Sequence, residues 1–231
     1  MGFAKMNIVH LCDCSDFRSM IENLKRKYEE SPVPEDGTAA IIAPVSITLE
    51  ELRLSRFPER YKDVTFESYR FYGTVEQQDR QRKLIDHLRR GKSVVMYGNN
   101  GTGKTMLAFC AIREQILLGH EAVYASMAGI VDEIKQGFSD NIASSRIVDK
   151  YIGYDYLVID EMDKAYGTPT EFLSIFKIIN GRYVTRRPTV LISNASDSEV
   201  IDIIGKSSFE RVVEDGAKVN MNWESYRLRR A

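Results

Sequence analysis

The stretch "YGNNGTGKTM", Tyr97–Met106, decides the fold. It holds three glycines, two asparagines and a lysine, a composition that suits neither a helix nor a strand. Gly98, Gly103, Lys104 and Thr105 satisfy the pattern G-x-x-x-x-G-K-[ST]. A random match in a chain of this length is roughly a one-in-a-hundred event. An apolar run precedes the stretch and a segment of helical periodicity follows it, so the pattern predicts a phosphate-binding loop.

The chemistry of such a loop follows from its residue types. Glycines allow successive backbone N–H groups to turn inward around phosphate oxygens, and the following helix adds its dipole. We expect Lys104 to reach the β- and γ-phosphates of ATP, and Thr105 to bind Mg²⁺. The expected nucleotide-binding residues are Gly98, Asn99, Asn100, Gly101, Thr102, Gly103, Lys104, Thr105 and Met106.

Strands and helices alternate on both sides of the loop. The runs that read as strands are 93–98, 121–126, 155–160, 189–194 and 218–223. Thr168 with Glu171, and Ser196 with Glu199, predict capping boxes at the start of two intervening helices. In the first of these helices one apolar stripe is formed by Phe172, Ile175, Phe176 and Ile179. The alternation predicts an α/β fold, a five-stranded parallel sheet with helices on both faces.

Composition narrows the class of protein. The chain has 231 residues and a net charge of −1, so we expect no bulk electrostatic attraction to nucleic acid. No apolar run approaches the roughly 20 residues that span a bilayer, so no membrane partner is expected. Three cysteines argue against a disulfide framework and for a reducing cytoplasm. His10, Cys12 and Cys14 match no common zinc pattern.

A second motif supplies carboxylates. The apolar run in "YLVIDEMD" delivers Asp160 and Glu161 to the carboxyl end of a strand. We expect Asp160 to bind Mg²⁺, directly or through water, and Glu161 to orient and polarise the attacking water. Asn194 ends the next strand, "TVLISN", where its amide would help to place that water. The Asp-Glu pair favours a hydrolase over a small-molecule kinase, which needs no water-activating carboxylate.

Phosphoryl transfer also needs positive charge, which a P-loop ATPase commonly takes from an arginine in trans. Arg211, in "SSFERVVED", lies on a short helix after the Asn194 strand and is the candidate. Arg182, in "NGRYVTRR", is its competitor. A structural role is the alternative for each arginine.

These motifs, in this order and followed by "NMNWESYRLRR", resemble the AAA+ ATPases of the DnaC-type helicase-loader and IstB-type transposition-helper group. The resemblance covers roughly residues 57–231 and includes the lead-in "SRFPERYKDVTFESYRFY". It implies an AAA+ P-loop fold whose helical lid domain is minimal or absent. It also implies Mg-dependent, slow, switch-like ATP hydrolysis and ATP-dependent self-assembly into a ring or spiral.

The resemblance also implies contacts with single-stranded DNA. By position, "EIKQGFSDN" resembles the DNA-contacting loop of a loader, with Phe138 stacking on bases and Lys135 near a phosphate. The alternative for Phe138 is a core residue at a helix end.

Residues 1–60 depart from this group. We expect them to form a small, mostly helical appendage and linker before an ATPase domain at 61–231. One face of the expected helix carries Phe17, Met20, Ile21, Leu24 and Tyr28. The loader resemblance implies that this face binds the replicative hexameric DNA helicase, while packing on its own domain is the alternative.

The expected function is therefore ATP-dependent loading of that helicase onto single-stranded DNA during replication initiation. An IstB-like helper of DNA transposition is the alternative from the same fold. An adaptor that binds ATP without useful turnover is a third reading, and intact Glu161 and Asn194 argue against it.

Overall fold

The computed structural model describes residues 57–140, 142–164 and 168–230. Within them, five strands form one parallel sheet in the order β2-β3-β4-β1-β5. The strands are β1 Val94–Tyr97, β2 Ala122–Ser126, β3 Tyr156–Asp160, β4 Thr189–Ile192 and β5 Ala217–Asn220. The prediction of a five-stranded parallel sheet is confirmed, although the fifth strand begins one residue earlier and ends three residues earlier than expected.

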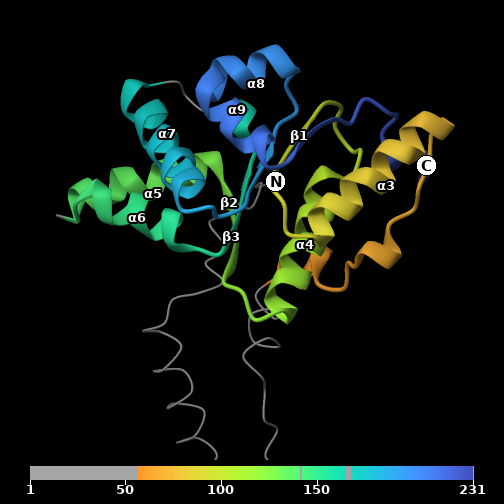
Figure 1. Cartoon of the computed structure of the whole chain (residues 1–231), viewed down its shortest axis with the longest axis horizontal. Coiled ribbons are helices and arrows are strands. Elements are labelled where there is room, and N and C mark those ends of the chain that lie inside the picture. Colours follow the sequence, from red (N-terminus) through yellow and green to blue (C-terminus); the bar gives the residue numbers. More distant parts are fainter. Residues whose placement is uncertain (1–56, 141, 165–167, 231) are drawn as a thin grey trace, which may run out of the picture.

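Helices cover both faces of the sheet, as predicted. The described helices are α3 Val75–Arg89, α4 Lys104–Leu117, α5 Met127–Ser139, α6 Ser144–Gly153, α7 Pro169–Val184, α8 Asp197–Ile204 and α9 Lys206–Glu214. Figure 1 shows α3 and α4 on one side of the sheet and the group from α5 to α9 on the other. Every residue of β1 to β4 is buried between these layers, which explains why the strands are continuous apolar runs.

The strand order brings distant parts of the sequence to one edge of the sheet. β4 lies between β3 and β1, and all three strands run in the same direction. The segments that follow them, which begin at Gly98, Glu161 and Ser193, therefore emerge side by side at the carboxyl edge. Ligands of open α/β sheets bind at this edge, so the topology itself places the predicted motifs where chemistry is expected.

The capping boxes and the apolar stripe predicted for two helices are found in part. Ser196 and Glu199 form the predicted capping box of α8. The side chain of Glu171 lies outside the described part of the chain, so the box at α7 stays a prediction. On the α7 stripe, Ile175 and Ile179 are buried, whereas Phe172 and Phe176 are 38% and 39% exposed. The helix therefore buries only half of that stripe.

The lead-in to the ATPase domain packs on α4. The ring of Phe57 lies edge-on to Phe109 at 5.2 Å, and Tyr61 stacks on the same ring at 4.6 Å. The domain boundary at 60/61 stays a prediction, because the predicted helix at 17–28, the helicase-binding face and the cysteine pair Cys12 and Cys14 all lie outside the described residues.

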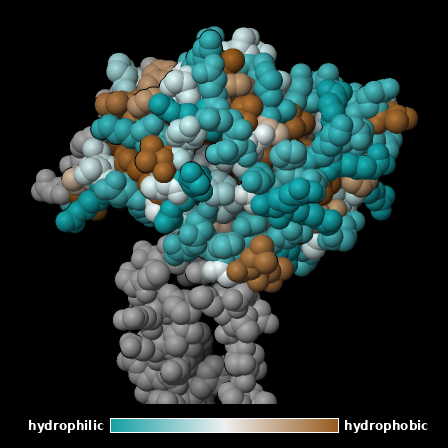
Figure 2. Space-filling model, viewed as in Figure 1, coloured by the Kyte–Doolittle hydropathy of each residue, from teal (hydrophilic) through white to brown (hydrophobic). Residues whose placement is uncertain are grey.

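The surface shown in Figure 2 is mainly polar, with a brown patch at the lower end of α4 where Leu117 and Leu118 are exposed. Among the described helices none combines the length and the apolar character that crossing a membrane requires.

Candidate functional site

Glycines shape the loop that joins β1 to α4. Gly98, Gly101 and Gly103 all have positive φ angles, of 114°, 75° and 99°. At Gly98 a Cβ would lie 2.9 Å from both Oδ1 of Asn220 and the carbonyl oxygen of Met221, so a side chain has no room. The loop leads directly into the N-terminus of α4, where free N–H groups and the helix dipole favour an anion.

A segment from the far end of the sequence closes the outer side of this loop. Three hydrogen bonds fix it: Asn99 N–H to the Met221 carbonyl (3.1 Å), Trp223 Nε1 to the Thr102 carbonyl (3.2 Å) and Tyr226 N–H to the Gly101 carbonyl (2.9 Å). Trp223 is almost fully buried. The "NWESYR" signature therefore acts as a wall that holds the phosphate-binding loop in shape.

Lys104 is the buried cation of the site. Its Nζ donates to the carbonyl oxygens of Gly98, at 2.8 Å, and Asn99, at 2.7 Å. Burial lowers the pKa of Lys104 to about 8, although the carboxylates of Asp160 and Asp163 act in the opposite direction. Carbonyl partners compensate a buried ammonium only in part, so a phosphate group would be a stronger partner.

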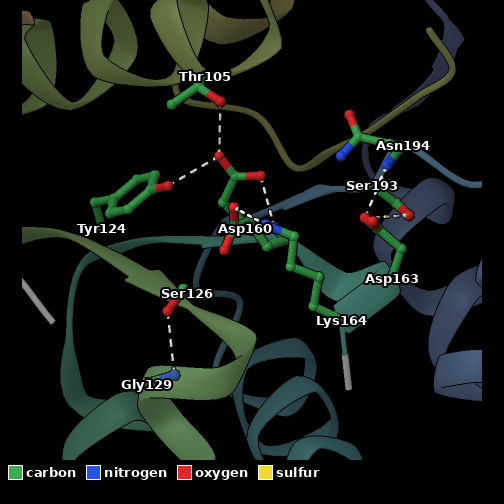
Figure 3. Close-up of polar contacts among 10 residues, drawn as sticks. Thr105, Tyr124, Ser126, Gly129, Asp160, Asp163, Lys164, Ser193 and Asn194 are labelled. Atoms are coloured by element: carbon green, nitrogen blue, oxygen red, sulfur yellow. Dashed lines mark hydrogen bonds and ion pairs between the residues drawn. The ribbon is translucent and has the colours of Figure 1, made fainter. Parts of the chain in front are cut away.

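Thr105 and Asp160 meet where α4 begins and β3 ends. Oγ1 of Thr105 donates to Oδ2 of Asp160 at 2.8 Å, and the hydroxyl of Tyr124 donates to the same oxygen at 2.9 Å (Figure 3). Burial raises the pKa of Asp160, and these hydrogen bonds offset part of that effect.

The same pair of oxygens suits Mg²⁺. An octahedral ion with ligands at 2.0–2.1 Å places neighbouring oxygens about 2.9 Å apart. The 2.8 Å separation between Thr105 Oγ1 and Asp160 Oδ2 matches one edge of such an octahedron. A hydroxyl and a carboxylate are also the oxygen ligands that this ion prefers.

Glu161 follows in an uncommon backbone conformation. Its φ angle is +58°, in the left-handed region that few residues other than glycine adopt. Its N–H donates to Oδ1 of Asp160 at 2.6 Å, which fixes the turn after β3. Its carboxylate is bound by Nζ of Lys164 at 2.5 Å. The expected water-orienting group thus forms an ion pair with a half-exposed lysine.

Asn194 is held beside this turn by an acidic residue. Oδ1 of Asp163 accepts from the backbone N–H of Asn194 at 2.9 Å and from Oγ of Ser193 at 3.2 Å (Figure 3). Burial acts to raise the pKa of Asp163, but the hydrogen bonds from Asn194, its own N–H and Ser193 prevail and lower it. Asp163 therefore fixes the segment after β4 to the segment after β3.

Arg182 has a structural environment. It is fully buried, and its guanidinium meets five acceptors: the carbonyl oxygens of Tyr151, Ile152, Tyr154 and Pro188, and Oγ1 of Thr189. Three of these carbonyls lie at the C-terminal end of α6, the negative end of its dipole. These bonds occupy Nε, Nη1 and Nη2, and the side chain is fully buried, so Arg182 cannot reach a neighbouring subunit.

Arg211, unlike Arg182, is partly exposed and has few polar contacts. It is half-buried on α9, with its guanidinium 5.7 Å from the ring centres of both Phe176 and Tyr183. Its one hydrogen bond, to Oγ of Ser207, is long at 3.4 Å, and no carboxylate of the described residues lies within ion-pair distance. Arg211 shares a cavity with Ser93, at the amino end of β1, so it lies at the sheet edge opposite the phosphate-binding loop.

The predicted DNA contacts lie on α5. Lys135 is exposed on this helix. Phe138 falls within the same helix, and its side chain lies outside what the structure describes. Both contacts stay predictions.

Sequence reasoning missed several residues of the site. Tyr124 and Asp163 bind the expected residues Asp160 and Asn194, and only the acidic spacing of "DEMD" hinted at the second. Arg227 also lies at the loop: its Cδ is 3.6 Å from the Cβ position of Gly101, and its charge helps to lower the pKa of Lys104.

Comparison with known proteins agrees with this geometry. Over 174 residues the chain is 26% identical to the replicative helicase loader DnaC of Escherichia coli K12, covering 73% of this chain and 71% of the loader. It is also 26% identical over 183 residues to the putative ATP-binding protein of insertion sequence IS5376 from Geobacillus stearothermophilus, covering 77% and 72%.

Solved structures share the fold. The crystal structure of a DnaC helicase loader matches 71% of this chain and 99% of that chain, with a TM-score of 0.59 and 17% identity. AMPPCP-bound DnaA from Aquifex aeolicus matches 74% of this chain with a TM-score of 0.60 and 20% identity, and the chain spans about half the length of that protein. At these identities the likeness establishes the fold alone, which is that of the AAA+ P-loop ATPases.

The family model of the IstB-like ATP binding proteins matches residues 47–231, which include all of the site described above. The chain belongs to the IstB-like ATP binding protein family.

Proposed function

We propose that this protein is an ATP-dependent loader that binds the replicative hexameric DNA helicase and helps to place it on single-stranded DNA. The main support is the resemblance in sequence to a replicative helicase loader, 26% identical across 174 residues. The ATPase domain, 61–231, would supply the nucleotide switch, and residues 1–60 would bind the helicase.

In the proposed reaction, Lys104 exchanges its two carbonyl acceptors for the β- and γ-phosphates of ATP. Thr105 and Asp160 would hold Mg²⁺, which neutralises phosphate charge when bound. Glu161 would leave Lys164 and orient the attacking water, with Asn194 beside it. Arg211 of a neighbouring subunit would stabilise the transition state, so hydrolysis would depend on self-assembly into a ring or spiral.

The alternative is an ATPase helper of DNA transposition. It is favoured by the family match and by the insertion-sequence relative, which is as similar to this chain as the loader is. The two functions differ in the partner of the N-terminal appendage and in the form of DNA that is bound.

A binding experiment separates the two. The tagged full chain, with ATP, is incubated with the host's hexameric replicative helicase or with the transposase of an associated insertion sequence. The matched control is a deletion of residues 1–50, which stops before Phe57 so that its contact with Phe109 is kept. The loader proposal expects capture of the helicase by the full chain alone. Capture of the transposase, without capture of the helicase, would support the alternative.

A further inference from the structure

A second concave site lies at the opposite edge of the sheet from the phosphate-binding loop. It is a cavity of about 300 Å³ between the loop before β1, the end of α7 and the last turn of α9. Its lining carries six cationic side chains: Arg90, Lys92, Arg182, Arg186, Arg187 and Arg211. Asp215 is the single acidic residue in that lining. We call this cavity the basic pocket.

Most of this positive charge has no carboxylate partner. Lys92, Arg186 and Arg211 make no ion pair within the described part of the chain. Arg182 is surrounded by carbonyl groups instead of carboxylates. Two of the six cations have acidic partners: Arg90 pairs with Asp86 at 2.9 Å, in an exposed pair that contributes little, and Arg187 makes a longer pair with Asp155.

Arg187 shows most clearly that the cations of the basic pocket lack acceptors. Its Nη1 is buried and has no hydrogen-bond partner in the part of the chain that the structure describes, although it forms a long ion pair, at 3.6 Å, with Oδ1 of Asp155. A buried guanidinium N–H without an acceptor is unfavourable, because it has lost its hydrogen bonds to water. An anion in the basic pocket would supply acceptors to this edge of the site.

We propose that the basic pocket binds a phosphate group of a nucleic-acid backbone. The planar guanidinium fork matches phosphate oxygens in pairs, and three arginines of the lining, Arg90, Arg186 and Arg187, are neither enclosed by carbonyls, as Arg182 is, nor assigned to a neighbouring nucleotide, as Arg211 is. The whole chain has a net charge of −1, so this local excess is where a polyanion would find attraction. This site is separate from Lys135 and Phe138, and it goes beyond the proposed loader activity.

The phosphates of ATP are the other source of the same chemistry. The chain's own nucleotide is excluded, because the four residues of β1 separate the pocket from the phosphate-binding loop by about 13 Å. In the proposed hydrolysis, Arg211 is the only one of these cations that acts on the nucleotide of a neighbouring subunit. The exposed cations lie on other elements, Lys92 in the loop before β1 and Arg186 in the turn after α7, so a backbone with several phosphates could contact both.

The test uses the full chain and a double variant, Lys92→Gln with Arg186→Gln. Both residues are exposed and lack ion-pair partners among the described residues, and glutamine keeps an unbranched side chain at the left-handed position 186. The control is Arg60→Gln with Lys177→Gln, which removes the same charge from exposed positions away from the basic pocket. Binding of fluorescein-labelled single-stranded and duplex 30-mers is followed by anisotropy at several salt concentrations.

If each lysine or arginine contacts one phosphate, the double variant should bind single-stranded DNA about 25-fold more weakly at 0.1 M salt, and its salt slope should fall by about 1.4. The control should stay within about twofold of the parent. ATP hydrolysis and the unfolding temperature of the double variant should be unchanged.

Two results would overturn the proposal. Equal DNA binding by the double variant and the control would show that the basic pocket contacts no backbone phosphate. Lost hydrolysis with unchanged DNA binding would assign the pocket to the nucleotide of a neighbouring subunit. Failure of helicase capture, with the DNA effect intact, would remove the loader proposal and leave the pocket standing.

Discussion

Replacing Arg182 by methionine removes a fully buried guanidinium while keeping most of its volume. Five acceptors then lose their donor: four carbonyl oxygens and Oγ1 of Thr189. Hydrogen bonds to a charged group contribute about 1.5–3 kcal/mol each, so the five together amount to about 7–15 kcal/mol. Burial opposes this gain, because it lowers the pKa of Arg182 from its usual value to about 9, which is roughly 5 kcal/mol against the charged form.

The difference is a net loss of about 2–10 kcal/mol on substitution. We take about 3–5 kcal/mol, the range found when one partner of a buried charged cluster is removed, which lies within it. In a chain of this size each kcal/mol moves the unfolding temperature by about 2–4 °C, so Arg182→Met should lower it by roughly 10 °C. Arg182→Lys should lower the unfolding temperature nearly as much, since one ammonium cannot reach the acceptors on α6 and on β4 together.

Differential scanning calorimetry measures this, with Arg211→Met as the matched control. Arg211 has one long hydrogen bond, so its substitution should shift the unfolding temperature by less than about 3 °C while abolishing hydrolysis. The reasoning would be refuted if Arg182→Met unfolded within about 2 °C of the parent and lost hydrolysis. Arg182 would then be the better candidate for the arginine in trans.

Three further predictions concern the nucleotide site. Glu161→Gln should leave ATP affinity within about threefold of the parent and lower kcat by about 100-fold or more. Lys164→Gln keeps the carboxylate and should retain turnover. Equal losses of kcat for the two variants in steady-state assays would contradict the water-orienting role of Glu161. Arg211→Ala subunits mixed with Glu161→Gln subunits should recover part of the hydrolysis that neither variant has alone, and no recovery at any ratio would argue for a structural Arg211. Burial lowers the pKa of Lys104 to about 8, and a bound triphosphate favours the charged form of the amine. ATP binding should therefore take up about 0.8 proton at pH 8.5 and about 0.1 proton at pH 7, as measured by calorimetry in buffers of different ionisation enthalpy. Equal proton uptake at both pH values would exclude this linkage.

Much of the fold was predictable from the sequence because its signals are local. The sheet is buried on both faces, so each central strand is an uninterrupted apolar run, and the phosphate-binding loop has a pattern of its own. The helix α3 carries no such signal. Its segment "VEQQDRQRKLIDHLR" is mostly polar, and one of its buried residues is Gln81, which bonds both backbone groups of Tyr72.

The rest of the site depends on contacts between distant residues. Trp223 donates to the carbonyl of Thr102, 121 positions earlier, and no local pattern encodes that contact. The difference between Arg182 and Arg211 has the same origin. Both follow apolar helical segments, and only the packing of α6 against α7 buries one of them.

The wall that Met221 and Trp223 build on the phosphate-binding loop has a consequence for biosynthesis. On the ribosome, most of the site described here, from Tyr97 to Arg211, is made before that wall. Until β5 follows, β1 is an open edge of four apolar residues, the kind of edge on which unfinished chains associate. A chain terminated before Trp223 would lack one support of its phosphate-binding loop. We therefore expect full-length molecules to bind nucleotide more tightly than prematurely terminated ones.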